Sequence, residues 1–505
     1  MKKLLFFILW ILPGIISAQK QDYNWVIGHD YNFNDENYGR IVINFHTAPP
    51  KANYFVGNEN MNMYITNASI SDSIGDLLFY TNGCNIANEN GQVIPNGDDL
   101  NPGDYHYSLC DDIGRGYTAG YPSAIILQLP ENDSIYYLFH GSVLYIPPPK
   151  EDAYVDRLLH SIVTISNNNK YVLEKNIPLL VDSLAGGEMN AVKHANGKDW
   201  WIILPRRNSN QFYVFLFTKD GIVDTLMQTM GNIPPASKEG YGQTVFSPDG
   251  TKMIRYFPYE DIMNFTFDRS TGTFTGYSTF SVNYGSDIAT QGGCGISPSG
   301  QFLYIAAAFQ VYQFDLWASN VSSSQIKVAV WDGFVDPIAI LFWFCQMGPD
   351  CKIYIEGGGD TRYYHIIHNP DEQGLACNVE QRGLIFPVPS GASIPYFPNY
   401  RLGPIDNPGL PCSPIVATQQ PSVAVPACSV WPNPASEQLH FALSEGNIKR
   451  IALTDAYGRV LRDLSLSGES DSYTLALGNV PVGVYFWVLE GRNGVKHAGK
   501  VVVQK

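Results

Sequence analysis

The side chains best suited to chemistry in this sequence are its eight cysteines, at positions 84, 110, 294, 345, 351, 377, 412 and 428. A structural zinc site needs closely spaced pairs of Cys or His ligands. Cys345 and Cys351 are six residues apart, and the chain contains no Cys-x-x-Cys unit. We therefore expect no metal, and disulfides or buried thiols instead. The candidate disulfide joins Cys84 and Cys110, which flank the turn-rich loop 96–107.

Histidines and acidic residues form no catalytic pattern. His365 and His368 lie three residues apart on a predicted strand, where such positions face opposite sides of the sheet and cannot easily share one ion. Asp249 and Asp350 follow proline in tight turns, where Asp is an ordinary turn residue. Nucleophile-elbow, phosphate-loop, zincin and EF-hand motifs do not occur. We therefore expect no catalytic residue and no cofactor.

The elements that position these side chains come from a repeat. The turn 246–250 (FSPDG) precedes an apolar strand, and it returns at 296–300 (ISPSG) and 347–351 (MGPDC). The prolines at 248, 298 and 349 lie 50 and 51 residues apart, a period typical of propellers. We predict an all-β fold, with a seven-bladed β-propeller over residues 19–403. Its last blade would combine strands near 25–45 with one near 394; six blades and an N-terminal cap is the alternative.

In such blades the first turns lie at one rim and the second turns at the other. Loops on a rigid scaffold are where binding residues usually lie. The second turns also include an insertion at about 141–156. The candidate ligand-binding residues on this rim are His140, Arg206, Arg207, Tyr259, Glu260, Asp360 and Arg362.

Two hypotheses on function remain open from the residues alone. One is a binding propeller whose ligand is a glycan, a peptide or a protein; the other is a polysaccharide hydrolase or lyase that uses rim carboxylates. We favour binding over enzymatic activity. The apolar run 338–345 is interpreted as the innermost strand of a blade, buried on both faces, rather than as an apolar ligand patch.

Charge and the N-terminus indicate export. The formal net charge is −15, with no basic run, so nucleic acid is not an expected partner. Lys2 and Lys3 precede the apolar residues 4–12, and residues 16–18 (ISA) match a small-residue cleavage site. Residues 1–18 are therefore predicted to be a signal peptide. The apolar run is too short to be a membrane span, and none is expected in the mature protein.

Composition changes after the predicted propeller. Residues 404–428 hold six prolines and are interpreted as a linker, and a small β module follows at 429–505. The stretches 431–436 (WPNPAS), 451–460 (IALTDAYGRV), 481–488 (PVGVYFWV) and 500–505 (KVVVQK) resemble the C-terminal type A sorting domain of the Bacteroidetes type IX secretion system. The residues that carry this sorting signal are Pro432, Asn433, Pro434, Gly458, Gly483, Tyr485, Lys500 and Lys505.

This resemblance implies a β-sandwich that the type IX machinery uses to export a passenger through the periplasm to the cell surface or the medium. The propeller region itself resembles β-propeller passengers of the same route. The matching stretches are 79–84 (FYTNGC), 96–103 (NGDDLNPG), 136–140 (YYLFH) and 396–403 (YFPNYRLG). The resemblance implies no particular activity or ligand.

Overall fold

The structure is a computed structural model that divides into two compact units, residues 1–417 and 418–505. It describes residues 19–28, 39–56, 61–112, 116–150, 152–235, 242–287, 289, 291–412, 428–443, 448–455, 459–466, 472–491 and 496–504. The predicted signal peptide lies outside these residues. Within them, no helix is both long and apolar enough to span a membrane.

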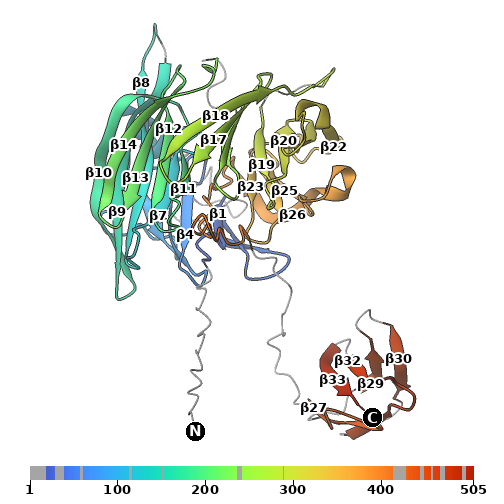
Figure 1. The fold of residues 1–505 in the computed structure, drawn as a ribbon. Coiled ribbons are helices and arrows are strands. Elements are labelled where there is room, and N and C mark those ends of the chain that lie inside the picture. Colours follow the sequence, from blue (N-terminus) through green and yellow to red (C-terminus); the bar gives the residue numbers. More distant parts are fainter. Residues whose placement is uncertain are drawn as a thin grey trace, which may run out of the picture. The chain divides into compact units, whose positions relative to one another are not determined.

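The described part of the first unit consists of seven antiparallel sheets in sequence order (Figure 1). Two have three strands: β1 (Asn24–Ile27), β2 (Gly39–Asn44) and β3 (Lys51–Val56); then β4 (Ala68–Ser71), β5 (Leu77–Thr81) and β6 (Ile86–Asn88). Five have four strands: β7 (Ala124–Gln128), β8 (Ile135–Ile146), β9 (Asp152–Ser166) and β10 (Asn169–Leu184); β11 (Asn190–Lys193), β12 (Trp200–Pro205), β13 (Gln211–Thr218) and β14 (Gly221–Thr229); β15 (Gln243–Phe246), β16 (Lys252–Tyr256), β17 (Ile262–Asp268) and β18 (Thr273–Phe280); β19 (Gly293–Ile296), β20 (Phe302–Ala307), β21 (Gln310–Asp315) and β22 (Ile326–Val330); β23 (Cys345–Met347), β24 (Ile353–Glu356), β25 (Thr361–Ile367) and β26 (Val379–Ser390). Short helical turns lie at Asp104–His106 (α1), Tyr107–Asp112 (η1), Ser322–Ser324 (η3) and Gly374–Cys377 (η4).

The sheets form a ring. The first strands of successive sheets lie side by side (β1 with β4, β4 with β7, β11 with β15, β15 with β19, and β19 with β23), and β26 of the last sheet lies against β2 and β3 of the first. Apolar side chains fill the space between neighbouring sheets; Phe212 of β13, for example, packs on Phe265 of β17 with ring centroids 5.4 Å apart. The unit is therefore the predicted β-propeller, and the number of its blades stays a prediction.

The predicted sharing of the last blade between the two ends of the chain is wrong. β1 pairs with β2, and β2 pairs with β3, so the N-terminal strands make a sheet of their own. The stretch around Ile394 belongs to no strand, although residues 391–398 are all buried.

The repeated turns link the first two strands of a sheet. In the 246–250 turn, Gly250 takes φ +73°, a left-handed conformation that glycine adopts without steric cost. The Asp249 carboxylate accepts hydrogen bonds from the Ser247 hydroxyl at 2.5 Å and from the Thr251 backbone N–H at 3.0 Å. Asp350 similarly accepts the Tyr354 hydroxyl at 2.8 Å. Both aspartates thus hold turn structure.

The predicted strand over the apolar run 338–345 is also wrong for most of its length. Only Cys345 begins a strand, β23. Residues 338–344 form an irregular connection in which Ile340, Phe342 and Phe344 are buried and Ile338 is 48% exposed. The connection leads from the outer strand β22 to the inner strand β23, so its alternating burial reflects packing on one side only.

The second unit consists of two sheets in its described residues. One contains β27 (Cys428–Trp431), β28 (Gln438–Leu443) and β31 (Ser472–Ala476); the other has the order β30 (Val460–Ser465), β29 (Ile448–Thr454), β32 (Gly483–Gly491) and β33 (Lys496–Val503). One apolar core joins residues of both sheets, including Leu439, Phe441, Ile451, Leu453 and Val501. Two sheets that share a core make the β-sandwich expected from the sequence.

Candidate functional site

The centre of the propeller is occupied by its own chain. We call residues 391–403 the central segment. Tyr396 donates its hydroxyl to the Asn190 side chain on β11 at 2.8 Å, and Tyr400 donates to the backbone carbonyl of Ile126 on β7 at 2.7 Å. The first strands of the ring thus pack on this segment from different sides. It occupies part of the channel that they surround and leaves a cavity of about 80 Å³ beside β11, β15, β19 and β23.

The central segment is fixed at its far end by charge and by a disulfide. Arg401 makes a bidentate ion pair with Asp22, which precedes β1, at 2.5 and 2.7 Å. Arg269 donates to the backbone carbonyl of Gly403 at 2.5 Å. Beyond it, Cys412 forms a disulfide with Cys351 in the third repeated turn. The proline-rich residues 404–412 are therefore attached to the propeller, and the boundaries of the linker stay a prediction.

At its start the central segment meets a buried carboxyl group. Glu356, on β24, is fully buried, and its Oε1 accepts the backbone N–H groups of Ser393 at 2.7 Å and Ile394 at 3.4 Å. Burial raises the pKa of Glu356 to about 8, against the effect of these two N–H donors. Its Oε2 has no hydrogen-bond partner among the described residues. Burial thus favours the protonated form of Glu356.

His140 is not a rim residue, and this part of the predicted site is wrong. Strand β8 continues to Ile146, so the insertion lengthens β8 and β9 and His140 lies inside the sheet. It is fully buried, with Nδ1 2.6 Å from Asn101 Oδ1 and Nε2 3.0 Å from Ser161 Oγ. Burial lowers its pKa to about 3. The neutral ring fixes the loop that carries Asn101.

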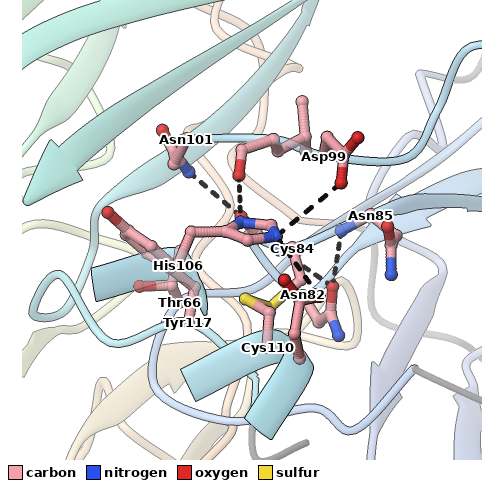
Figure 2. The surroundings of a disulfide bond; sticks show 12 residues. Thr66, Asn82, Cys84, Asn85, Asp99, Asn101, His106, Cys110 and Tyr117 are labelled. Atoms are coloured by element: carbon pink, nitrogen blue, oxygen red, sulfur yellow. Dashed lines mark hydrogen bonds and ion pairs between the residues drawn. A yellow bond between two sulfur atoms is a disulfide. The ribbon is translucent and has the colours of Figure 1, made fainter. Parts of the chain in front are cut away.

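The same loop carries the predicted disulfide. Cys84 and Cys110 are bonded, with their Cα atoms 5.8 Å apart. Figure 2 shows Asn101 beside the disulfide, where its Nδ2 donates to the Gly83 carbonyl at 3.0 Å. The loop then contacts β10, because Val172 donates its N–H to the Pro95 carbonyl at 3.0 Å. The disulfide therefore stabilises the contact between the second and third sheets.

The other predicted rim residues lie in turns of three different sheets or beside them. Tyr259 accepts the Ala289 N–H at 2.9 Å with its hydroxyl oxygen, and its neighbour Glu260 is half-buried. Asp360 is an exposed turn residue, and Arg362, on β25, donates to the Pro387 carbonyl at 3.1 Å. Tyr259 and Arg362 are thus held by contacts with residues 30 and 25 positions further along the chain.

Arg206 and Arg207 do line one pocket together. Arg206 pairs with Asp182 at 2.9 Å. Arg207 makes a bidentate pair with Asp152, with both N–O distances 3.0 Å, and lowers the pKa of that carboxyl group. The remaining lining residues of the pocket are Ala185, Glu188, Asn208, Pro234, Pro235, Arg255 and Phe257.

Sequence reasoning missed Arg255 and Glu188 at the bottom of this pocket. Arg255 stands alone among apolar residues in 253–257 (MIRYF), and a charged side chain at such a position is the signal that could have found it. Its Nε donates to Glu188 Oε2 at 2.7 Å, and the two side chains are only 1% and 4% exposed. Among the described residues, no three or more His, Cys, Asp or Glu side chains are grouped to bind a metal ion.

In the second unit, the predicted sorting residues hold backbone structure. Asn433 lies between two cis peptide bonds that precede Pro432 and Pro434. Its side chain accepts the Val502 N–H at 2.9 Å and donates to the Lys500 carbonyl at 3.2 Å. Tyr485 is buried and donates to the Pro481 carbonyl at 3.0 Å, and Gly483 begins β32. Gly458 and Lys505 lie outside the described residues.

The molecule is thus a β-propeller followed by a β-sandwich. Residues 429–504 match the model of the secretion system C-terminal sorting domain family. The chain is therefore a passenger of type IX secretion, and it is exported to the cell surface or the extracellular space.

No curated protein matches the chain. Among solved structures, the periplasmic gluconolactonase of Pseudomonas aeruginosa matches with 13% identity and a TM-score of 0.40, over 74% of this chain and 99% of its own. A Desulfotomaculum acetoxidans protein of unknown function gives 14% and 0.38, over 74% and 100%. The Dos1 propeller gives 11% and 0.35, over 66% and 86%. Similarity at this level gives no information on activity.

Proposed function

We propose that this protein is a binding protein of the cell surface or the extracellular space, and that the second-turn rim of its propeller binds the ligand. The observation that carries the proposal is the pocket lined by Arg206, Arg207 and Arg255. It is small, with a volume of about 10 Å³, and it runs from exposed residues of the rim, Arg206 and Asn208, to buried ones, so a ligand enters only when the exposed side chains move aside. Because the central segment occupies the channel, a ligand approaches the propeller from its rims or its outer strands.

A propeller whose channel is occupied by its own chain makes a rigid scaffold for such loops. The turn with Arg206 and Arg207 is connected to the long strands β9 and β10 through Asp152 and Asp182. Residues held in this way lose little conformational entropy when a ligand binds, which favours affinity. The proposed ligand is an extracellular glycan, peptide or protein that presents hydrogen-bond acceptors to the arginines.

The test uses the secreted protein on an array of glycans and peptides, with turnover of the same compounds followed in parallel. The double variant Arg206→Ala/Arg207→Ala is expected to lose binding and to stay folded. The more exposed Arg206–Asp182 pair contributes about 0–1 kcal/mol, and a melting curve of the variant measures the cost of losing the partly buried Arg207–Asp152 pair. Arg382→Ala is a matched control for Arg207, because Arg382 belongs to another sheet and makes the same kind of bidentate pair, with Asp332. Like Arg207, it also packs on an aromatic ring, that of Phe334. Unchanged binding by the double variant would refute the rim site, and turnover would indicate an enzyme.

A further inference from the structure

Arg255 is a buried guanidinium group that is only partly satisfied. Its Nε donates to Glu188, but its Nη1 is buried and has no hydrogen-bond partner among the described residues. The guanidinium carbon lies 5.3 Å from the ring centroid of Phe212 and 5.4 Å from that of Phe257, and neither ring offers an oxygen. A buried donor without an acceptor costs about 1–3 kcal/mol, more when it is charged. Such a group is well suited to receive an acceptor from a ligand.

Arg255 is also held rigidly. Glu188 Oε2, which accepts its Nε at 2.7 Å, accepts the Thr244 hydroxyl at 2.8 Å as well. The two aromatic rings limit the guanidinium group on its other sides. The donors that remain therefore have a fixed direction before any ligand arrives, which is the condition for strong charge-assisted hydrogen bonds.

The geometry points to Arg255 as the anchor for a ligand carboxylate in the pocket that Arg206 and Arg207 border. This inference rests on the proposed function, and it adds the chemical class of the ligand. The planar fork of a guanidinium group matches the two oxygens of a carboxylate. Arg206, at the entrance, and Arg207 keep the potential around the entering group from becoming negative.

The charges around the pocket favour a monoanion. Glu188, Asp182 and Asp152 already pair with Arg255, Arg206 and Arg207, one carboxylate to each arginine. Among the described lining residues, a dianion such as phosphate would meet three arginines that are each already matched by a carboxylate, whereas a monoanionic carboxylate needs only the unused donors of Arg255. Phe257, Pro234 and Pro235 leave apolar walls beside it. The acid can belong to an acidic sugar or to a small organic acid.

Titration calorimetry on the full mature protein at pH 7 and low salt tests the inference with five probes: D-galacturonate, its methyl ester, D-galactose, acetate and inorganic phosphate. We expect galacturonate to bind and its methyl ester and galactose not to bind, because the ester removes the charge and leaves the ring unchanged. Binding of acetate as well would assign the affinity to the acid group alone, and its absence would assign the site to acidic sugars. Equal binding of the ester, tighter binding of phosphate, or no binding of either acid would overturn the inference.

The matching variants are Arg255→Lys, which keeps the charge beside Glu188 but loses the fork, and Arg382→Lys in another sheet as the control. Arg255→Lys is expected to weaken galacturonate binding about tenfold or more, and Arg382→Lys to leave it unchanged. Equal effects of the two variants would overturn the role of Arg255. If Arg255→Lys does not fold, the five probes on the unmodified protein decide. An array ligand without a carboxylate that still requires Arg206 and Arg207 would leave the proposed function standing and refute only this inference.

Discussion

Glu356 provides the sharpest test of how the central segment is held. Its pKa is raised from 4.5 to about 8 by burial, so the folded protein keeps this proton while the unfolded chain releases it above pH 4.5. The stabilising contribution is therefore complete below pH 4.5 and is lost as the pH rises to 8. Each pH unit in this range corresponds to about 1.4 kcal/mol, so the whole loss is about 5 kcal/mol.

The window for measurement is pH 6.5 to 8. Burial lowers the pKa of His140 to about 3 and of His365 to about 4, and it also lowers the pKa of His160. As the unfolded chain loses its histidine protons across this window, these three residues raise the free energy of unfolding by about 1 kcal/mol in all. Glu356→Gln leaves them unchanged, so the difference between the wild type and the variant isolates Glu356. Burial lowers the pKa of Lys193 to about 8, so it acts at and above that value. Within the window, the free energy of unfolding is expected to fall by about 2 kcal/mol through Glu356.

The perturbation is Glu356→Gln. The glutamine Oε1 can still accept the N–H groups of Ser393 and Ile394, but the side chain no longer titrates, so the decrease between pH 6.5 and 8 should disappear. Denaturant unfolding at four pH values in this window measures the slope of the free energy of unfolding against pH. A destabilisation by the amide that does not depend on pH leaves this slope unchanged. Glu131→Gln, at an exposed ion pair with Lys198, is the control and should keep the wild-type slope. A wild-type slope in Glu356→Gln would refute the assignment.

Three further predictions concern the buried histidines, the Cys351–Cys412 disulfide and the C-terminal sorting domain. In the Glu356→Gln background, lowering the pH from 6.5 to 5 should cost about 3 kcal/mol, because His140 and His365 stay neutral when folded and are protonated when unfolded. Denaturant unfolding at the two pH values measures this difference, and equal stabilities would contradict it. Cys412→Ser should lower the free energy of unfolding by about 4 kcal/mol, the chain-entropy value for a loop of 61 residues, and reductant should then change its denaturation midpoint less than it changes that of the wild type. Deleting 429–505 should leave the propeller folded and trap it in the periplasm, which cell fractionation and limited proteolysis can check; secretion of the truncated protein at the normal level would be the opposite result.

Local patterns in the sequence predicted the propeller because its turns need particular residues. Pro248 and Gly250 fix backbone angles that few other residues adopt. Because each such turn joins the first two strands of a sheet, the repetition of these turns at a constant spacing predicts the succession of sheets. The central segment has no such signal. Residues 391–403 bury nearly every side chain without belonging to a strand, so neither alternation nor turn residues mark them. A short apolar stretch of this kind predicts a strand from sequence, and only the tertiary contacts show that it is an irregular segment.

The candidate site was predictable in part, for the same reason. Arg206 and Arg207 stand in a turn, and turns can be located from sequence. His140 was misplaced because β8 continues beyond the expected turn, and a strand that is longer than its neighbours gives no local warning. Arg255 reaches the pocket from the interior of β16, where its position depends on the packing of two sheets and on Glu188 from a distant connection.

The central segment also determines when this protein can finish folding. The sheets are made in sequence order, but the residues that fill the space between them come after the last sheet. A chain that ends near residue 390 would contain every sheet of the propeller but not the central segment. Asn190 and Gln346 would then lack the hydrogen bonds that Tyr396 and Phe397 donate to them. Early domains of a nascent chain often fold before later ones appear, whereas here the first sheet gains its ion pair from Asp22 to Arg401 only after the last sheet has been made. The residues that complete the propeller thus precede the sorting domain in the sequence, with only residues 404–428 between them, so a chain that carries the sorting domain also carries everything needed to close the ring.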